Sequence, residues 1–157
     1  MASEKEPAKG KNSGPLAENR KANFNYAIVE TLEAGIQLRG TEVKACRAGK
    51  INLSDGYAAF RGDELYLQNV NISEYSHGNR ENHAPLRTRK LLLHRKELNK
   101  LISLTRSGMS LIPLRVYIKN SHVKVLLGLG KGKKTHDKRE DLKKKQATRE
   151  IERSLRR

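Results

Sequence analysis

The sequence contains one cysteine, Cys46, no tryptophan and only 4% aromatic residues. A single cysteine cannot form a disulfide within the chain, which suits a reducing cytoplasm, and we interpret Cys46 as a small buried apolar residue. Few aromatic residues, with no cluster of them on one predicted strand, argue against a platform that stacks the bases of a single strand. Long apolar runs, a signal peptide and a lipidation motif are also absent, so we expect no membrane partner.

Groups that could bind a metal or perform catalysis are scattered along the sequence. The histidines have no cysteine or third ligand at short spacing; they are His77, His83, His94, His122 and His136. Residues 128–134 combine glycines with lysines but lack the Walker spacing of a phosphate-binding loop. No strained-elbow motif surrounds a serine or cysteine nucleophile. We therefore expect no metal, no cofactor and no enzymatic activity.

Positive charge is what the sequence has in excess, with 33 Lys and Arg against 17 Asp and Glu and a formal net charge of +16. Residues 31–130 carry sixteen basic and eight acidic side chains, and residues 131–157 carry twelve and five. Both parts of the chain are therefore basic, which a polyanion touching both explains better than a basic tail on a neutral domain. Nucleic acid is the usual partner of this kind, because each neutralised phosphate releases counterions.

Composition divides the chain into three parts. Residues 1–16 are polar with Lys, Glu, Gly, Ser and Pro, and we expect them to be disordered. Residues 17–130 carry the apolar patterns of an RNA-binding body. Residues 131–157 form a basic tail that we expect to be disordered when free, because its apolar stripe is thin and surrounded by like charge. A partner that supplies the opposite charge could make the tail helical.

Alternating apolar residues predict that the body is mainly β. One strand begins near Phe24 and continues past Gly35, where we expect a bulge or a bend. Other strands cover residues 57–60, 65–67, 111–118 and 123–127. Strands and helices do not alternate as in βαβ repeats. A small closed antiparallel OB-like barrel, with about six strands and two or three short outer helices, fits this order best.

Capping residues predict where helices and loops lie. One helix has Thr41 as its N-cap and ends at Gly49; another opens with residues 91–93 and ends at Gly108. The polar stretch 71–89 is predicted to be a long loop. Residues 128–134 are predicted to be a flexible hinge into the tail.

Basic side chains beside the predicted barrel elements suggest a face that contacts phosphates and leaves base contacts to neighbouring polar groups. This face consists of Asn19, Arg20, Lys21, Lys44, Arg47, Lys50, Arg87, Arg89 and Lys90. The shortage of aromatic residues for stacking favours a folded RNA recognised by shape. Each charge of the face alone could be a solvated surface group. In the tail, His136 can stack on a base or donate to phosphate, and Asp137 could cap a helix. A plain basic tail that only adds affinity stays open on these residues alone.

Six motifs in order carry a resemblance that covers roughly residues 17–140. They are ENRKA at 18–22, EAGIQL at 33–38, GTEVK at 40–44, RAGK at 47–50, TRKLLL at 88–93 and GKKTHDKR at 132–139. With them the chain resembles the small protein B family, the tmRNA-binding proteins of bacterial trans-translation. The resemblance implies an OB-like barrel with outer helices and without catalytic activity.

The resemblance also implies binding at the elbow of the tRNA-like part of tmRNA, and delivery of alanyl-tmRNA to ribosomes stalled without a stop codon. The residues that it assigns to tmRNA are Asn19, Arg20, Lys21, Glu33, Leu91, Lys133 and Lys134. From the basic face we add Lys44, Arg47, Arg89 and Lys90 to these contacts. Glu33 would repel phosphate, so it would accept a hydrogen bond from a base amino group or a ribose hydroxyl.

For the tail, the resemblance implies entry into the empty mRNA path of the small ribosomal subunit, where the tail becomes helical. His136 would stack on a base of the decoding centre, while Lys138 and Arg139 contact rRNA phosphates beside Asp137. The expected partners are therefore tmRNA and the ribosome, and we expect a monomer when the protein is free. The alternative is a structural or assembly protein that stays on rRNA, which should not prefer tmRNA to tRNA.

Overall fold

The computed structural model describes residues 14–77 and 82–156, so most of the N-terminal segment predicted to be disordered lies outside the described residues. The elements follow one another as β1 (Ala17–Glu18), α1 (Ala22–Asn25), β2 (Tyr26–Ile36), α2 (Gly40–Arg47), β3 (Ile51–Asn52), β4 (Tyr57–Arg61), β5 (Glu64–Gln68), β6 (Asn71–Ile72), β7 (Arg89–Leu92), α3 (Arg95–Arg106), β8 (Ser110–Lys119), β9 (His122–Gly132) and α4 (Thr135–Leu155).

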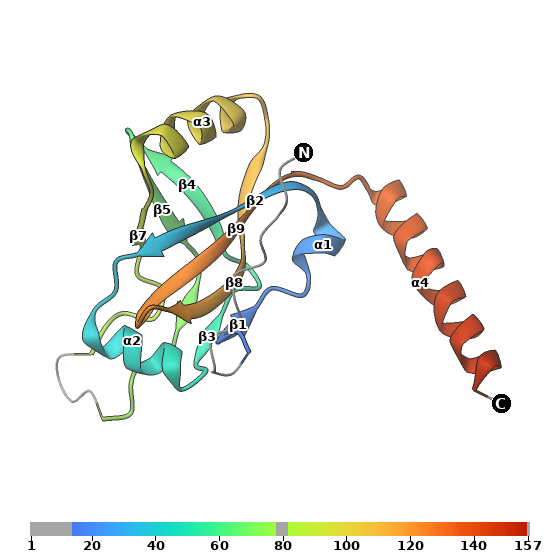
Figure 1. Ribbon diagram of the computed structural model, residues 1–157, viewed down its shortest axis with the longest axis horizontal. Helices are drawn as coiled ribbons and strands as arrows, with labels where there is room; N and C mark the ends of the chain where they lie inside the picture. The colour runs from blue at the N-terminus through green and yellow to red at the C-terminus, as the bar shows by residue number, and fades with distance from the viewer. Residues whose placement is uncertain (1–13, 78–81, 157) are drawn as a thin grey trace.

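Six strands form a ring that closes on itself (Figure 1). Their order is β8-β4-β5-β7-β2-β9, and β9 pairs again with β8; every pairing in the ring is antiparallel. Strand β1 pairs with β8, and β3 pairs with β6 in a separate two-stranded sheet. The prediction of a mainly β body with about six strands is confirmed at this level. Pairing all around the ring leaves its long strands without a free edge, which protects them from joining other chains.

The core fills the ring because alternate side chains of each strand point inward. Buried residues of this kind include Ala34, Leu67 and Leu127. Helix α2 adds Ala45 and Cys46 to the same cluster, and burial raises the pKa of the Cys46 thiol to about 11. In Figure 1, α3 lies above the strands and α2 below them, so the helices cover the two ends of the ring.

Strand β9 runs farther than the sequence predicted. Residues 128–132 belong to it, so the predicted hinge at 128–134 is wrong for most of its length. Its glycines serve close packing: a Cβ atom on Gly130 would lie 2.5 Å from the carbonyl oxygen of Ala27, and one on Gly128 would lie 2.9 Å from a Leu114 methyl. Only Lys133 and Lys134 separate β9 from α4.

Two further predictions of local structure are wrong. Residues 91–92 do not open a helix; they end β7, and α3 begins at Arg95 after His94. The run of three leucines has no alternation, so its period could not distinguish a strand from a helix. Helix α2 has Arg39 rather than Thr41 at its N-cap, where the backbone N–H of Arg39 donates to Glu42.

The ends of the helices were predicted more accurately than their starts. The predicted stops at Gly49 and Gly108 are confirmed, since both glycines have positive φ just after a helix, at 75° and 100°. The turn formed by Asn120 and Ser121 joins β8 to β9 with φ of 51° and 65°, the two positive angles of a type I′ hairpin. The bulge in β2 lies at Val29 rather than at Gly35.

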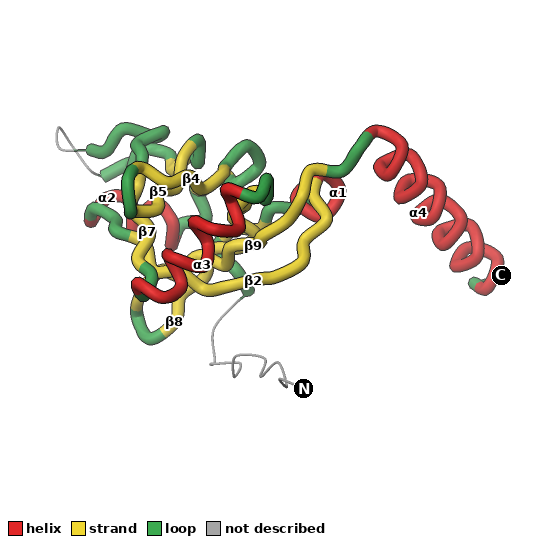
Figure 2. Tube along the Cα trace, turned by 90° about the horizontal axis from the view of Figure 1, so that it is seen from above, coloured by secondary structure: helices red, strands yellow, loops and turns green. Residues whose placement is uncertain are grey.

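Most of the tail that the sequence predicted to be disordered when free, residues 135–155, is helix α4, which leaves the body after β9 and projects from it in both views (Figures 1 and 2). None of its side chains is buried. Near the other end of the described residues, the Leu16 N–H donates to the Val116 carbonyl at 2.7 Å, next to the pairing of β1 with β8. None of the helices in residues 14–77 and 82–156 has the length and apolar character that crossing a bilayer requires.

Candidate nucleic-acid interface

Arg89 does not belong to the surface. Its side chain is fully buried, donates to the carbonyls of Val70 and Pro85 at 2.9 and 3.0 Å, and has Nε 3.4 Å from Glu42. Glu42 is fully buried too and accepts from both Arg87 Nε at 2.7 Å and Arg87 Nη2 at 2.9 Å. The prediction that Arg89 contacts phosphate is therefore wrong. Arg89 and Glu42 form a buried ion pair that joins β7 to α2, and the half-buried Arg87 extends this pair into an ion cluster.

In β7 the exposed leucine is Leu92, and not Leu91, which was the leucine predicted to contact tmRNA. Leu91 is 2% exposed and packs in the core, whereas Leu92 is 50% exposed. Strand alternation makes this difference obligatory: if one residue points inward, the next points outward. Leu91 therefore cannot meet an RNA on this surface, and Leu92 occupies the position that an RNA could reach.

An outer face surrounds Leu92, and the registers of three strand pairs define it. Gly35 lies opposite Leu92 on β7 and opposite Lys124 on β9, and Lys124 in turn lies opposite Tyr117 on β8. Glu33 is two residues before Gly35 on the same side of β2, because Ala34 between them is buried. We call Glu33, Leu92, Tyr117, Lys119 and Lys124 the outer patch.

Glu33 is held in the outer patch by two neighbours. Tyr117 donates its hydroxyl to one carboxylate oxygen, and Lys119 Nζ lies 3.4 Å from both oxygens. Burial and the hydrogen bond to Glu33 raise the pKa of the Tyr117 phenol. A carboxylate fixed between a phenol and an ammonium group keeps lone pairs that can accept from a base amino group or a ribose hydroxyl. The sequence did not indicate that Tyr117, Lys119 and Lys124 lie beside Glu33, because none of the six motifs contains them.

Asn19 is only 7% exposed, and its side chain forms hydrogen bonds within the body. Its Nδ2 donates to the carbonyls of Leu53 at 3.3 Å and Pro113 at 3.1 Å, which ties the start of the chain to β8 and to the turn before β4. Its Oδ1 is buried without a partner among the described residues. The prediction of Asn19 as a direct RNA contact is therefore wrong in this fold, while the neighbouring Arg20 and Lys21 are exposed.

The base of the tail is fastened to α1. Lys133 donates its ammonium group to the Asn23 carbonyl at 2.8 Å and to the Asp141 carboxylate, and its backbone N–H donates to the Asn25 carbonyl at 2.8 Å. Lys138 Nζ lies 5.8 Å from the centre of the Phe24 ring. These contacts set the direction in which α4 leaves the body.

The predicted ribosome-binding residues all lie on the first turns of α4. His136, Asp137 and Arg139 are exposed, and Lys138 is half-buried. The helix begins at Thr135, so Asp137 is a first-turn acid rather than the cap, and its charge there favours the helix dipole. His136, Asp137 and Glu140 offer ligand atoms within 4.8 Å of one another, but they are exposed groups on one helical turn with no further feature that indicates a metal.

The remaining predicted contacts lie apart from the outer patch. Lys44 and Arg47 are exposed on α2, with Lys44 Nζ 5.4 Å from the centre of the Tyr75 ring. Lys90 is paired with Glu64 at 2.9 Å, and this hydrogen bond raises the pKa of Lys90. Lys134 is exposed beside the start of α4. The structure thus spreads the basic residues over the outer patch, α2 and the tail rather than gathering them on one face.

Comparison with known proteins covers both the body and the tail. The family model described as SmpB protein matches residues 16–157. The chain is 61% identical over 142 residues to the SsrA-binding proteins of Bacillus velezensis and Bacillus subtilis, covering 90% of this chain and 91% of each relative. The SsrA-binding protein of Enterococcus faecalis is 57% identical over 89% of this chain and 92% of its own.

Similarity extends to a solved structure. A chain from the structure named "tmRNA-SmpB: a journey to the center of the bacterial ribosome" superposes with a TM-score of 0.64 at 48% identity, covering 78% of this chain and 87% of the other. The resemblance drawn from six short motifs is therefore confirmed over nearly the whole sequence. The chain belongs to the SmpB protein family.

Proposed function

We propose that this chain is a tmRNA-binding adaptor of trans-translation, which brings tmRNA to ribosomes stalled without a stop codon and performs no catalysis itself. One observation carries the proposal: relatives with about 90% coverage in both directions are named for binding SsrA. We take SsrA to be the tmRNA that the name of the similar solved structure couples to SmpB and the bacterial ribosome. The protein would accordingly work in the cytoplasm, and as a monomer when free.

The body would hold the tRNA-like part of tmRNA. The six-stranded ring, which we infer to be a small OB-like barrel, presents the outer patch with one exposed leucine, one fixed carboxylate and two lysines. Lysines supply affinity for phosphates, whereas an oriented carboxylate and an apolar side chain supply specificity for base and ribose groups. Arg20, Lys21, Lys44, Arg47 and Lys134 remain candidate phosphate contacts on the same molecule.

The tail would occupy the decoding centre and the empty mRNA channel. The first turn of α4 presents His136 for stacking on a base, with Lys138 and Arg139 for rRNA phosphates. Helix α4 has no buried side chain, so its stability in the free protein lacks the tertiary packing from which most helices draw their stability. We propose that residues 133–157 are only marginally ordered when free and become a stable helix where an anionic channel neutralises them.

A truncation tests this division of labour. Removing residues 133–157 leaves β9 complete, so the body should fold and retain substantial tmRNA binding in a gel-shift competition against tRNA, while peptide tagging in a stalled-ribosome assay is lost. The double variant Lys138→Ala, Arg139→Ala should behave in the same way. Loss of tmRNA binding by the truncated body would show that the division is wrong. A full-length chain that does not prefer tmRNA to tRNA would instead favour a permanent rRNA-binding protein.

A further inference from the structure

A cavity of about 870 Å³ lies between the ring and the base of the tail. Its wall includes α1 and the start of β2 on one side, and the turn before β4 and the start of β4 on the other. Lys133 and Lys138 belong to its rim, so the tail leaves the body beside it. The volume falls within the range of sites that hold small ligands.

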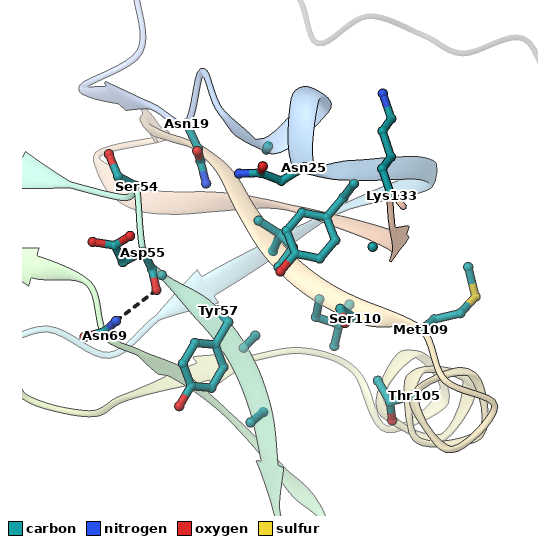
Figure 3. Close-up of a pocket in the computed structure, with 18 of the residues that line it drawn as sticks. Asn19, Asn25, Ser54, Asp55, Tyr57, Asn69, Thr105, Met109, Ser110 and Lys133 are labelled. Carbon is teal, nitrogen blue, oxygen red and sulfur yellow. Dashed lines mark hydrogen bonds between the residues drawn. The ribbon is translucent and has the colours of Figure 1, made fainter. Parts of the chain in front are cut away.

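Aromatic residues from two strands line the cavity. Tyr26 comes from β2, and Tyr57 and Phe60 come from β4. Tyr57 is 43% exposed, and its hydroxyl is held by Gln68 at 3.2 Å, which fixes the ring. Figure 3 draws Tyr57 among the residues that line the cavity, below Asp55 and Asn69. Tyr26 lies on a different strand from Tyr57 and Phe60, so the sequence alone does not show that these residues line one cavity.

Polar groups line the same cavity. Figure 3 shows the amide of Asn25 at the upper wall, and Ser54 and Asp55 on the wall opposite the Lys133 side. The Asp55 carbonyl accepts from Asn69 at 3.1 Å, which fixes the turn that carries the Asp55 side chain. Within residues 14–77 and 82–156, no hydrogen bond engages the Asn25 amide or the Asp55 carboxylate. An amide and a carboxylate of this kind can accept hydrogen bonds from a base.

We propose that this cavity binds one unstacked nucleotide of an RNA, with the base against Tyr57 and its amino group donating to Asp55 and Asn25. The inference rests on the proposed RNA-binding function and adds a site to it. A carboxylate repels phosphate, so Asp55 can only favour the base, while Lys138 at the rim is placed for the phosphate. Adenine, cytosine and guanine carry an exocyclic amino group and uracil does not, so uridine is the disfavoured nucleotide.

The test is a titration of the full-length protein with AMP, CMP, GMP and UMP, followed through backbone amide resonances. Saturable shifts should appear at Asn25, Asp55 and Tyr57, with UMP binding most weakly. Tyr57→Ala should weaken binding about fivefold or more, the range found when one stacking ring is removed. Tyr57→Phe should bind as the wild type does, and Asp55→Asn should reduce the preference over UMP. Tyr75→Ala, which removes a ring outside the cavity, is the matched control.

Absence of saturable shifts at the cavity, or equal affinity of Tyr57→Ala and the wild type, overturns the inference. Gel-shift binding of tmRNA separates this result from failure of the proposed function, because tmRNA affinity would then persist without a nucleotide site. A photo-reactive phenylalanine in place of Tyr57 shows whether the nucleotide comes from tmRNA or from rRNA. Cross-links in the binary complex with tmRNA would identify a tmRNA nucleotide, and cross-links that appear only on the ribosome would identify an rRNA nucleotide. Cross-links to ribosomal protein alone would contradict the site.

Discussion

The substitution Glu42→Gln should lower the free energy of unfolding, because this glutamate is fully buried beside two arginines. Glutamine keeps the shape of Glu42 and can still accept from the Arg39 backbone, where the N–H lies 3.1 Å away. It removes the negative charge that faces Arg87 and the fully buried Arg89. Arg89 would then be a buried cation without a counter-ion.

Removing one partner of a buried ion pair costs about 3–5 kcal/mol, because the remaining charge keeps its desolvation penalty. Since glutamine retains part of the hydrogen bonding, we expect about 3 kcal/mol for Glu42→Gln, against about 5–15 kcal/mol for the whole stability of such a domain. The control is Glu30→Gln, which breaks the exposed pair between Glu30 and Lys100 at 2.6 Å. An exposed pair contributes about 1 kcal/mol or less.

The measurement is urea unfolding followed by circular dichroism, in which Glu42→Gln should lower the midpoint by about 1–2 M. Burial by itself would raise the pKa of Glu42, but hydrogen bonds from Arg87 and the Arg39 backbone, with the charge of Arg89, outweigh it and lower the pKa. The stabilisation is therefore complete above the ordinary glutamate pKa and is lost as pH falls through the lowered one. The gap between wild type and variant should shrink below about pH 4.3. A gap under about 0.5 kcal/mol at pH 7 would refute the buried cluster.

Three further predictions concern the outer patch, β9 and the tail. Leu91→Ala should destabilise the fold by about 2–5 kcal/mol in thermal unfolding, whereas Leu92→Ala should leave the fold intact and weaken tmRNA binding in a gel shift; the opposite pattern would reverse the assigned faces. Gly130→Ala should lower the melting temperature, because its Cβ would lie 2.5 Å from a carbonyl oxygen of β2, and an unchanged melting temperature would count against this strand packing. Asp141→Asn should loosen α4 from the body, seen as faster amide relaxation in the helix at pH 7. The hydrogen bond from Lys133 lowers the pKa of Asp141, so the wild-type contact should persist above the ordinary carboxyl range and be lost as pH falls through the lowered pKa.

Local patterns in the sequence were enough for the class of fold and the location of several turns. Gly49 and Gly108 end helices because only a residue that accepts positive φ can follow them, and this requirement is local. Asn120 and Ser121 turn the β8–β9 hairpin with positive φ, a conformation in which asparagine is enriched. The excess charge in body and tail, and the order of six motifs, likewise needed no structure to indicate an RNA-binding protein of this family.

Tertiary structure alone decided which of the candidate residues an RNA can reach. Three consecutive leucines carry no period, so only the pairing of β7 with β2 could place Leu91 inside and Leu92 outside. In the sequence, Arg89 cannot be distinguished from a charge on the surface. Only the fold places Glu42, 47 positions away, beside it in the interior. Local sequence determines backbone conformation through sterics and hydrogen bonding, whereas burial is a property of the neighbours that the completed fold brings together.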